Sequence, residues 1–322
     1  MSSASLAYLS SISRNFKSKT LTKGLINELL AETEWKNAVN ILKERGYFEE
    51  VSYNFDDMEY LIKSNAIQNL LLLMNLSMSV KTSYYIASLY YYILTLDEFE
   101  NIISAIYNKV NIQNARIFQK IMESKPENLN ELVNLIRDSI HGKALQYALS
   151  KNPHDLSQLN SYLDYYFILE LSKTIEGLRG DWKASADSIV CGYKDYYTVS
   201  MAIRQKTQEN VVCKVSLDVI KDLVNSRSST ETIDILRRIS YARSMEFTNV
   251  YSALSSLYRE VRVLARKNAL NAFMGSPFTP VTVLGISEIL RLDKEDLISI
   301  LNGIKLKMNP DKIKSKLSFE MV

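Results

Sequence analysis

One amphipathic pattern occurs four times along the chain. It is clearest in residues 195–206, where apolar side chains recur at intervals that place them on one face of an α-helix. Residues 8–19, 98–109 and 293–304 fit the same pattern. Each copy has three apolar-face positions, and eleven of these twelve are apolar: Leu9, Phe99, Tyr196, Lys294; Ile12, Ile102, Val199, Leu297; and Phe16, Ile106, Ile203, Leu301. The pattern therefore predicts four copies of one helix.

Charged residues lie at both ends of these copies. Glu98, Asp195 and Asp293 open three of them, where a carboxylate would meet the positive end of the helix dipole. Basic residues close the copies at 8–19, 98–109 and 195–206, at Lys17, Lys19, Lys109, Arg204 and Lys206. Two interpretations of the basic residues remain open. They either complement the negative helix ends and are solvated, or form a pseudo-threefold ring that faces a cavity or a partner.

The spacing of the copies is that of a domain. Successive copies start 90, 97 and 98 residues apart, which is too long for a solenoid repeat but suits a small domain. Two short amphipathic helices follow each of the first three copies, at 23–31 and 34–44, 117–122 and 129–136, and 217–224 and 232–239. Longer helices connect them, at 58–79 with 82–94, 156–177 and 246–273. We predict three similar helical domains, residues 1–94, 95–191 and 192–289, and a closing segment, 290–322, that packs back on the first.

Composition supports this interpretation and excludes several functions. Nine glycines and five prolines in 322 residues leave few helix breakers, which predicts an all-α fold. Basic and acidic residues number 39 and 36 and are interleaved, without the basic stripe of a nucleic-acid-binding protein. The most apolar run, residues 66–94, contains Gln68, Asn69, Asn75 and Lys81, so we expect it in the core and not across a membrane. The N-terminus also lacks the pattern of a secretory signal.

No motif predicts catalysis, a metal site, a cofactor or a small-molecule substrate. Cys191 and Cys213 are too few for a disulfide framework or a metal cage, so we expect packing residues in a reducing compartment. His141 and His154 have no metal-ligand spacing around them. Close carboxylates are predicted in exposed turns or helix starts, where their pKa would be ordinary; these are Glu49 and Glu50, Asp56 and Asp57, and Asp293 and Asp296.

The C-terminal part of the chain carries a resemblance to a known family. Residues 264–278 form a basic helix end followed by Gly275, Pro277 and Phe278, and residues 292–303 form an acidic helix start that runs to a glycine. Tyr8 and the sequence of residues 13–21 near the N-terminus agree with the opening of the same family. The chain resembles the C subunit of archaeal A-type ATP synthases, whose family includes the d subunit of eukaryotic vacuolar (V-type) ATPases.

The resemblance implies a fold, a function and partners. The fold would be a funnel of three similar helical-bundle domains around a pseudo-threefold axis. The function would be that of a non-enzymatic central-stalk (rotor) subunit, present in a single copy as a peripheral protein on the cytoplasmic face of the cell membrane. It would couple the central-shaft subunits to the membrane proteolipid ring, for ATP synthesis or for hydrolysis-driven transport of protons or other ions. The alternative is a soluble α-helical scaffold or regulatory protein of three repeated domains.

Overall fold

The computed structural model describes residues 3–112, 115–242 and 247–320, and every regular element in these ranges is helical. The prediction of an all-α fold is confirmed. Six helices are long: α4 (Phe55–Leu76), α5 (Lys81–Tyr107), α9 (Leu156–Glu176), α10 (Asp181–Arg204), α13 (Val250–Asn271) and α14 (Val281–Lys305). The others are α1 (Ser3–Lys17), α2 (Lys23–Leu30), α3 (Trp35–Glu44), α6 (Gln119–Ser124), α7 (Leu129–Ile136), α8 (Ile140–Ser150), α11 (Leu217–Asn225), α12 (Ser229–Leu236), α15 (Pro310–Lys314) and the 3₁₀ turn η1 (Ser240–Ala242). Within these ranges, no helix has the length and apolar composition that crossing a membrane requires.

The long helices form three hairpins, α4 with α5, α9 with α10, and α13 with α14. The second helices begin at residues 81, 181 and 281, a spacing of one domain. The first helices begin after Asn54, Asp155 and Asn249, whose side chains each accept a backbone N–H from the first turn. Residue 246, the expected start of α13, lies outside the described ranges. The repeat that the sequence predicts is therefore a capped helical hairpin.

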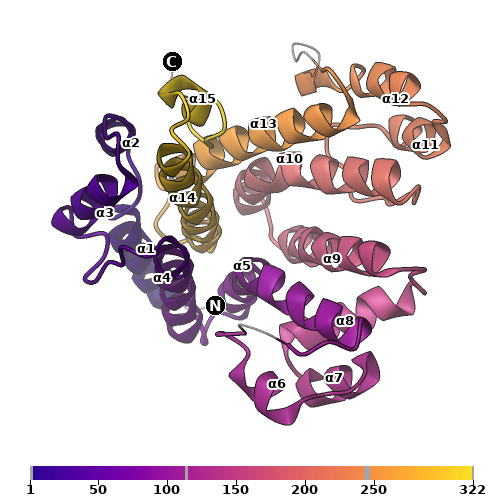
Figure 1. Ribbon diagram of the computed structural model, residues 1–322, viewed down its shortest axis with the longest axis horizontal. Coiled ribbons are helices and arrows are strands. Elements are labelled where there is room, and N and C mark those ends of the chain that lie inside the picture. Colours follow the sequence, from indigo (N-terminus) through magenta and orange to yellow (C-terminus); the bar gives the residue numbers. More distant parts are fainter. Residues whose placement is uncertain (1–2, 113–114, 243–246, 321–322) are drawn as a thin grey trace.

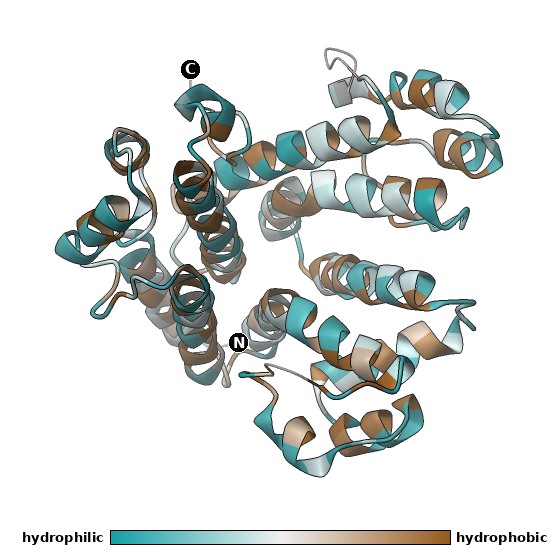
Figure 2. Cartoon of the chain, in the orientation of Figure 1, coloured by the Kyte–Doolittle hydropathy of each residue, from teal (hydrophilic) through white to brown (hydrophobic). Residues whose placement is uncertain are grey.

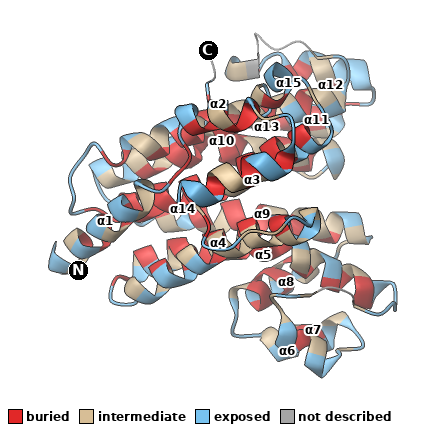
Figure 3. Ribbon diagram, turned by 60° about the vertical axis from the view of Figure 1, so that its left-hand side comes forward, coloured by how far each residue is buried: buried red, intermediate tan, exposed pale blue. Residues whose placement is uncertain are grey.

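The three hairpins contact one another in a closed ring (Figure 1). Helix α5 packs on α9, α10 packs on α13, and α14 packs on both α4 and α5. Helix α1 lies against α14 and α4. The shorter helices surround this ring, with α7 and α8 beside α5, and α11 and α12 beside α10 and α13 respectively (Figure 3). The ring of long helices is the frame on which the candidate site is built.

Two hydrophobic cores hold the ring together. Brown and teal bands alternate along the long helices in Figure 2, because apolar residues recur at helical spacing. The larger core includes many aromatic rings, among them those of Tyr90, Tyr92, Tyr165 and Tyr166, which are all buried. The smaller core joins α2, α3 and the start of α4 to the end of α14 and to residues 313–319. The N-terminal helices and the C-terminal segment thus share one core.

The predicted domain boundaries do not coincide with the ends of helices. Contact between residues 313–319 and the N-terminal helices is what the predicted closing role of residues 290–322 requires. The divisions predicted after residues 94, 191 and 289 fall inside α5, α10 and α14. Each of these helices would then end one repeat and begin the next, and the division stays a prediction.

The second helix of each hairpin ends in the same way. Lys109, Lys206 and Lys307 each lie two residues beyond the last helical residue, with φ of 54°, 53° and 54°. The next backbone N–H reaches back to a carbonyl near the end of the helix in all three, as in a Schellman-type C-cap. Lysines at these points also lie near the negative end of the helix dipole. The recurring basic residue is therefore part of helix termination in α5 and α10.

Alignment by these helix ends corrects the register of the fourth copy. Glu98, Asp195 and Asp296 each lie nine positions before the last residue of their helix. The sequence alignment had placed Asp293 in this position, one helical turn too early, and this was wrong. In the corrected register the apolar face of α14 is formed by residues 297, 300 and 304, which are all buried. Lys294, the one polar residue on the predicted face, does not belong to it.

The expectation that these acids start helices was also wrong. Both α5 and α10 begin well before Glu98 and Asp195, and Asp195 is fully buried. The Asp195 carboxylate accepts backbone N–H groups from residues 213, 214 and 215 at 2.8, 3.0 and 3.2 Å and the hydroxyl of Tyr241 at 2.7 Å. Glu98 Oε1 accepts the backbone N–H groups of residues 117 and 118 at 2.6 and 3.3 Å. Each acid anchors the chain that follows its long helix.

The two cysteines are joined in a disulfide. Cys191 and Cys213 have Cα atoms 5.3 Å apart, so the expectation of two separate packing residues was wrong. Chain segment 205–216 folds back along α10 and is anchored on Asp195, one helical turn after Cys191. This return places Cys213 beside Cys191, a proximity that their separation in the sequence does not reveal.

Removal of this disulfide should lower stability. The bond closes a loop with a sequence separation of 22 residues, and we expect Cys213→Ser to reduce the free energy of unfolding by about 3 kcal/mol. Denaturant unfolding of the wild type and of Cys213→Ser measures this difference. The wild type is unfolded both without a thiol reductant, with the disulfide intact, and with one, with the disulfide reduced. The Cys191→Ser variant is the control and should lose the same amount. Identical unfolding of the wild type in both conditions would show that the bond contributes nothing.

Candidate functional site

Arg291 of α14 lies buried at the centre of the ring and joins three helices. Its Nη1 donates to the Tyr258 hydroxyl at 3.1 Å and to Glu295 at 2.7 Å. Its Nε and Nη2 donate to Glu288 at 3.2 and 2.9 Å, and Nη2 also donates to the Tyr193 hydroxyl. All five N–H groups of the guanidinium thus have a partner. The charge is compensated although Arg291 is only 3% exposed, and α10, α13 and α14 are held together.

The ion pairs continue along the contact between α13 and α14. Arg262 Nε lies 3.0 Å from Glu295, and its Nη2 lies 2.6 Å from Asp296. Arg266 Nη2 lies 3.2 Å from Asp296 and 2.8 Å from Asp293. Acids and arginines alternate, and we call the whole series the ion-pair ladder, formed by Glu288, Arg291, Glu295, Arg262, Asp296, Arg266 and Asp293.

The ladder overturns the prediction that Asp293 and Asp296 are exposed. Asp296 is 0% exposed and Asp293 is 7% exposed. The signal in the sequence was a pair of spacings: Arg262 and Arg266 are four residues apart on one helix, and the two acids are three residues apart on another. Both spacings place their residues on one helix face, so facing helices could pair them. The sequence does not show which helices touch, so this pairing could not be predicted from it.

Both chain ends are tied to the ladder. Asp296 accepts the backbone N–H of Ser318 at 3.1 Å and its hydroxyl at 2.6 Å. Asp293 accepts the backbone N–H of Leu21 at 2.9 Å. Burial alone would raise the pKa of Glu295, but Arg291 and Arg262 hold it at about 2. Glu295 therefore stays charged and paired at neutral pH.

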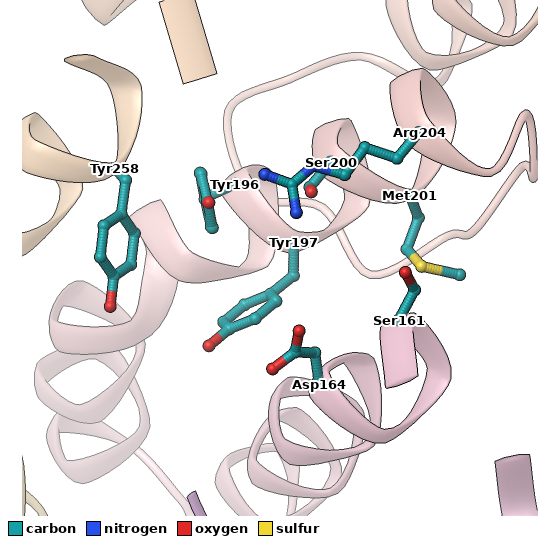
Figure 4. Close-up of a pocket in the computed structure, with 8 residues that line it drawn as sticks. All are labelled: Ser161, Asp164, Tyr196, Tyr197, Ser200, Met201, Arg204 and Tyr258. Atoms are coloured by element: carbon teal, nitrogen blue, oxygen red, sulfur yellow. The ribbon is translucent and has the colours of Figure 1, made fainter. Parts of the chain in front are cut away.

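A polar cavity lies next to the ladder, toward the C-terminal end of α10. It has a volume of about 170 Å³ and is lined by residues of α9, α10 and α13. Figure 4 shows its lining, which is Ser161, Asp164, Tyr196, Tyr197, Ser200, Met201, Arg204 and Tyr258. We call this cavity, together with Glu100 of α5 beside it, the socket. Most of its side chains are partly exposed, so the socket is accessible to a partner.

The two acids of the socket differ from those of the ladder. Burial and the nearby charges of Asp164 and Asp97 raise the pKa of Glu100 to about 8. Burial raises the pKa of Asp164 to about 6, and Arg204 partly offsets this rise. Across residues 3–112, 115–242 and 247–320, no lysine or arginine nitrogen lies within 4.0 Å of either carboxylate. Asp164 thus lines the cavity, and Glu100 lies near enough to Asp164 to feel its charge, and neither has an ion-pair partner from the described chain.

The chemistry of the socket suits a polar side chain of another molecule. The Tyr196 ring lies 4.8 Å from the Tyr258 ring and 5.5 Å from the Tyr197 ring, centroid to centroid. Aromatic faces and carboxylates together favour a cation. No cluster of three or more metal-binding side chains occurs in the described part of the chain.

Comparison with protein families identifies the chain. Residues 9–316 match the family model of the ATP synthase (C/AC39) subunit. The chain belongs to this family. The match spans nearly the whole of the C/AC39 chain and confirms the resemblance to the archaeal C and eukaryotic d proteins. A search of curated proteins found no significant match. The C/AC39 chain is thus a subunit of an A/V-type ATP synthase, and its partners are among the other subunits of that complex.

The predicted interface residues of the C/AC39 subunit do not share one cavity. Arg204 lines the socket. Lys206 instead donates to the Leu223 carbonyl at 3.1 Å and to the carbonyl and hydroxyl of Ser226, both at 2.9 Å. It therefore caps the C-terminal end of α11 within the chain.

The other three predicted residues lie apart from the socket. Lys17 Nζ lies 5.0 Å from the centre of the Phe273 ring. Lys19 lines a separate groove that also includes Asp293. Lys109 is exposed beside a shallow hollow at the end of α5. A role for these residues at an interface stays a prediction, and they form no common ring around one cavity.

Sequence reasoning missed Glu100 and Asp164 as site residues of the C/AC39 subunit. Asp164 is the signal that could have found them, because it interrupts a strongly apolar stretch, Tyr162–Leu169, in a helix that must be buried. An acid in such a position needs a partner or a function. Its neighbour Glu100 lies on a different hairpin, so the pair becomes visible only in the fold.

Proposed function

We propose that this C/AC39 subunit is the central-stalk coupling of its ATP synthase, joining the rotating shaft to the proteolipid ring of the membrane. The observation that carries this proposal is the socket, an accessible polar cavity of about 170 Å³ beside a buried, fully paired Arg291. A shaft end could seat polar side chains in the socket. The ion-pair ladder beside the socket would hold the helices that line it in fixed positions.

A rotor coupling must transmit torque without bending, and the fold suits this task. The long helices form a closed ring, so a force on one hairpin is shared with both neighbours. Asp296 and Asp293 attach the C-terminal and N-terminal segments to the ladder. The chain also has only nine glycines in 322 residues. Few flexible positions and a closed ring support a stiff adaptor.

We assign no catalytic step to the subunit. The ladder acids are paired with arginines, which suits a structural role. The socket acids are raised in pKa, and no cluster of three or more metal-binding side chains lies among the described residues. We also propose that the subunit is present in a single copy, at the end of the shaft on the cytoplasmic face of the membrane.

Removal of the subunit from the complete ATP synthase tests the proposal. We expect the complex without it to hydrolyse ATP while ion pumping is lost, and added wild-type subunit to restore pumping. ATP hydrolysis and ion uptake are measured on the same reconstituted vesicles. Preserved pumping in complexes shown to lack the subunit would reject the coupling role. So would failure of the pure subunit to bind either the shaft or the ring at micromolar concentration.

A further inference from the structure

We propose that the socket binds a basic side chain, a lysine or an arginine, at the foot of the shaft. The ammonium or guanidinium group would lie between the carboxyl groups of Glu100 and Asp164, against the rings of Tyr196 and Tyr197. The inference rests on the proposed function, which supplies the shaft as the partner. It adds the chemistry by which the shaft is recognised.

Glu100 supplies the first argument, because its Oε1 is shielded from solvent and has no hydrogen-bond partner. A buried polar atom without a partner is rare in a native protein, and it usually signals an absent ligand, water or ion. Asp164 lies near enough for its charge to raise the pKa of Glu100. A cation between the two carboxyl groups would satisfy both of them.

The ladder supplies the second argument by contrast. There the chain pairs buried acids with its own arginines, as with Glu288 and Arg291 at 2.9 Å and Asp296 and Arg262 at 2.6 Å. Ladder and socket lie within one ring, yet the described chain places no such ion pair on Asp164 or Glu100. The ladder acids thus have cationic partners from the chain itself, and Glu100 and Asp164 have none.

The aromatic lining supplies the third argument, independent of the acids. Tyr196, Tyr197 and Tyr258 all line the cavity, with neighbouring rings inclined by 72° and 39°. A cation over a tyrosine face is attracted by the electron-rich face of the ring, and more strongly when it is desolvated. An acidic side chain would gain nothing from these faces and would be repelled by the Asp164 carboxylate. The lining thus favours a basic ligand over an acidic one.

Among the described residues that line the cavity, Arg204 is the one cation, and it allows a test of whether the ligand is basic or acidic. Arg204 is exposed, and in Figure 4 its side chain extends from α10 to lie above Tyr197, near enough for its charge to offset part of the rise in the pKa of Asp164. A basic ligand would be repelled by Arg204, whereas an acidic ligand would be attracted by it. Replacement of Arg204 by glutamine therefore changes affinity in opposite directions for the two kinds of ligand.

Binding of a cation should also release a proton. Burial and the neighbouring acids raise the pKa of Glu100 to about 8, so it is mostly protonated in the free protein at pH 7. A bound cation favours the carboxylate, so the proton is lost on binding. The other charged and titratable groups around the socket are Asp97 on α5, Asp164 on α9, Tyr196, Tyr197 and Arg204 on α10, Tyr258 on α13 and Glu295 on α14.

Calorimetric titration of the purified shaft subunits into the full-length protein tests the inference. We expect Glu100→Gln and Asp164→Asn each to weaken binding about tenfold, from the loss of one charge-assisted contact. Arg204→Gln should strengthen it several-fold. Glu176→Gln, at the far end of the helix that carries Asp164, is the matched control and should leave affinity unchanged. Titration at pH 7 in two buffers of different ionisation enthalpy should detect proton release for the wild type and none for Glu100→Gln.

The outcomes separate this inference from the proposed function. A shaft that binds the wild type and all four variants equally would reject the basic ligand and leave the coupling role intact. A shaft that does not bind the wild type would reject the coupling role itself. Weaker binding by Arg204→Gln with tighter binding by Glu100→Gln would assign an acidic ligand and overturn the inference. Thermal unfolding guards against misfolding, because Glu100→Gln removes an unpaired buried acid and should unfold at the same temperature as the wild type or higher.

Discussion

Replacement of Asp296 with alanine is expected to cost about 3–5 kcal/mol of folding stability, the largest loss that we predict for a single substitution. The carboxylate contacts Arg262 at 2.6 Å and Arg266 at 3.2 Å, and it accepts the hydroxyl of Ser318 at 2.6 Å. Its removal leaves two buried guanidinium groups with an incomplete set of acceptors. The penalty arises mainly from these stranded charges, since a buried ion pair by itself adds little net stability.

Urea unfolding of the wild type and of Asp296→Ala measures this loss of folding stability. Asp311→Ala is the control, because the side chain of Asp311 is 88% exposed and its loss should change stability by less than about 0.5 kcal/mol. Replacement of Arg262, Arg266 and Asp296 together by apolar residues should recover part of the loss, since no charge then remains unpaired there. A loss below about 1 kcal/mol for Asp296→Ala would show that the ladder does not hold the C-terminal segment.

The sequence predicted the helices well because local information determines them. The short helices expected at 23–31, 34–44 and 129–136 match α2, α3 and α7 almost to the residue. Apolar residues at helical spacing, few glycines and polar residues between helices are sufficient for this level of prediction. The all-α class follows from the same signals.

The errors in the prediction involve residues whose environment depends on contacts between helices. Asp293 and Asp296 lie one turn apart, and both satisfy a local preference for an acid near a helix start. Only the packing of α13 on α14 brings Arg262 and Arg266 to them and shows that they are buried. A repeat alignment by hydrophobic positions also cannot distinguish registers one turn apart, since both place residues on nearly the same face.

The socket lay beyond sequence reasoning for the same reason. Glu100 and Asp164 belong to different hairpins, and neither lies in a motif. The basic residues that recur in the sequence drew the prediction of an interface, but Lys109 and Lys206 recur because α5 and α10 end alike. A pattern that recurs in the sequence indicates a local structure that recurs, here the end of a helix. The socket is formed by residues of different hairpins, and these residues are not repeated.

Asp195 and Glu98 allow a test of how strongly these acids anchor the chain that follows α10 and α5. Asp195→Ala should cost about 4 kcal/mol, because it leaves three backbone N–H groups and the Tyr241 hydroxyl without their acceptor, at about 1 kcal/mol or more for each donor. Glu98→Ala, at the equivalent position of α5, should cost about half as much, since Glu98 accepts only two N–H groups. Equal losses would show that the number of donors does not determine the anchoring energy.

A double-mutant cycle with Cys213→Ser extends this test, because Asp195 and the disulfide hold the same returning segment. Cys213 donates its backbone N–H to Asp195 at 2.8 Å and its sulfur is bonded to Cys191. Once either attachment is lost, the segment can move away, and the second attachment then has less native structure to stabilise. We therefore expect the double variant to lose less than the sum of the single losses, by about 1 kcal/mol or more, in urea unfolding of the oxidised proteins. Additive losses would mean that the two attachments act on the segment independently.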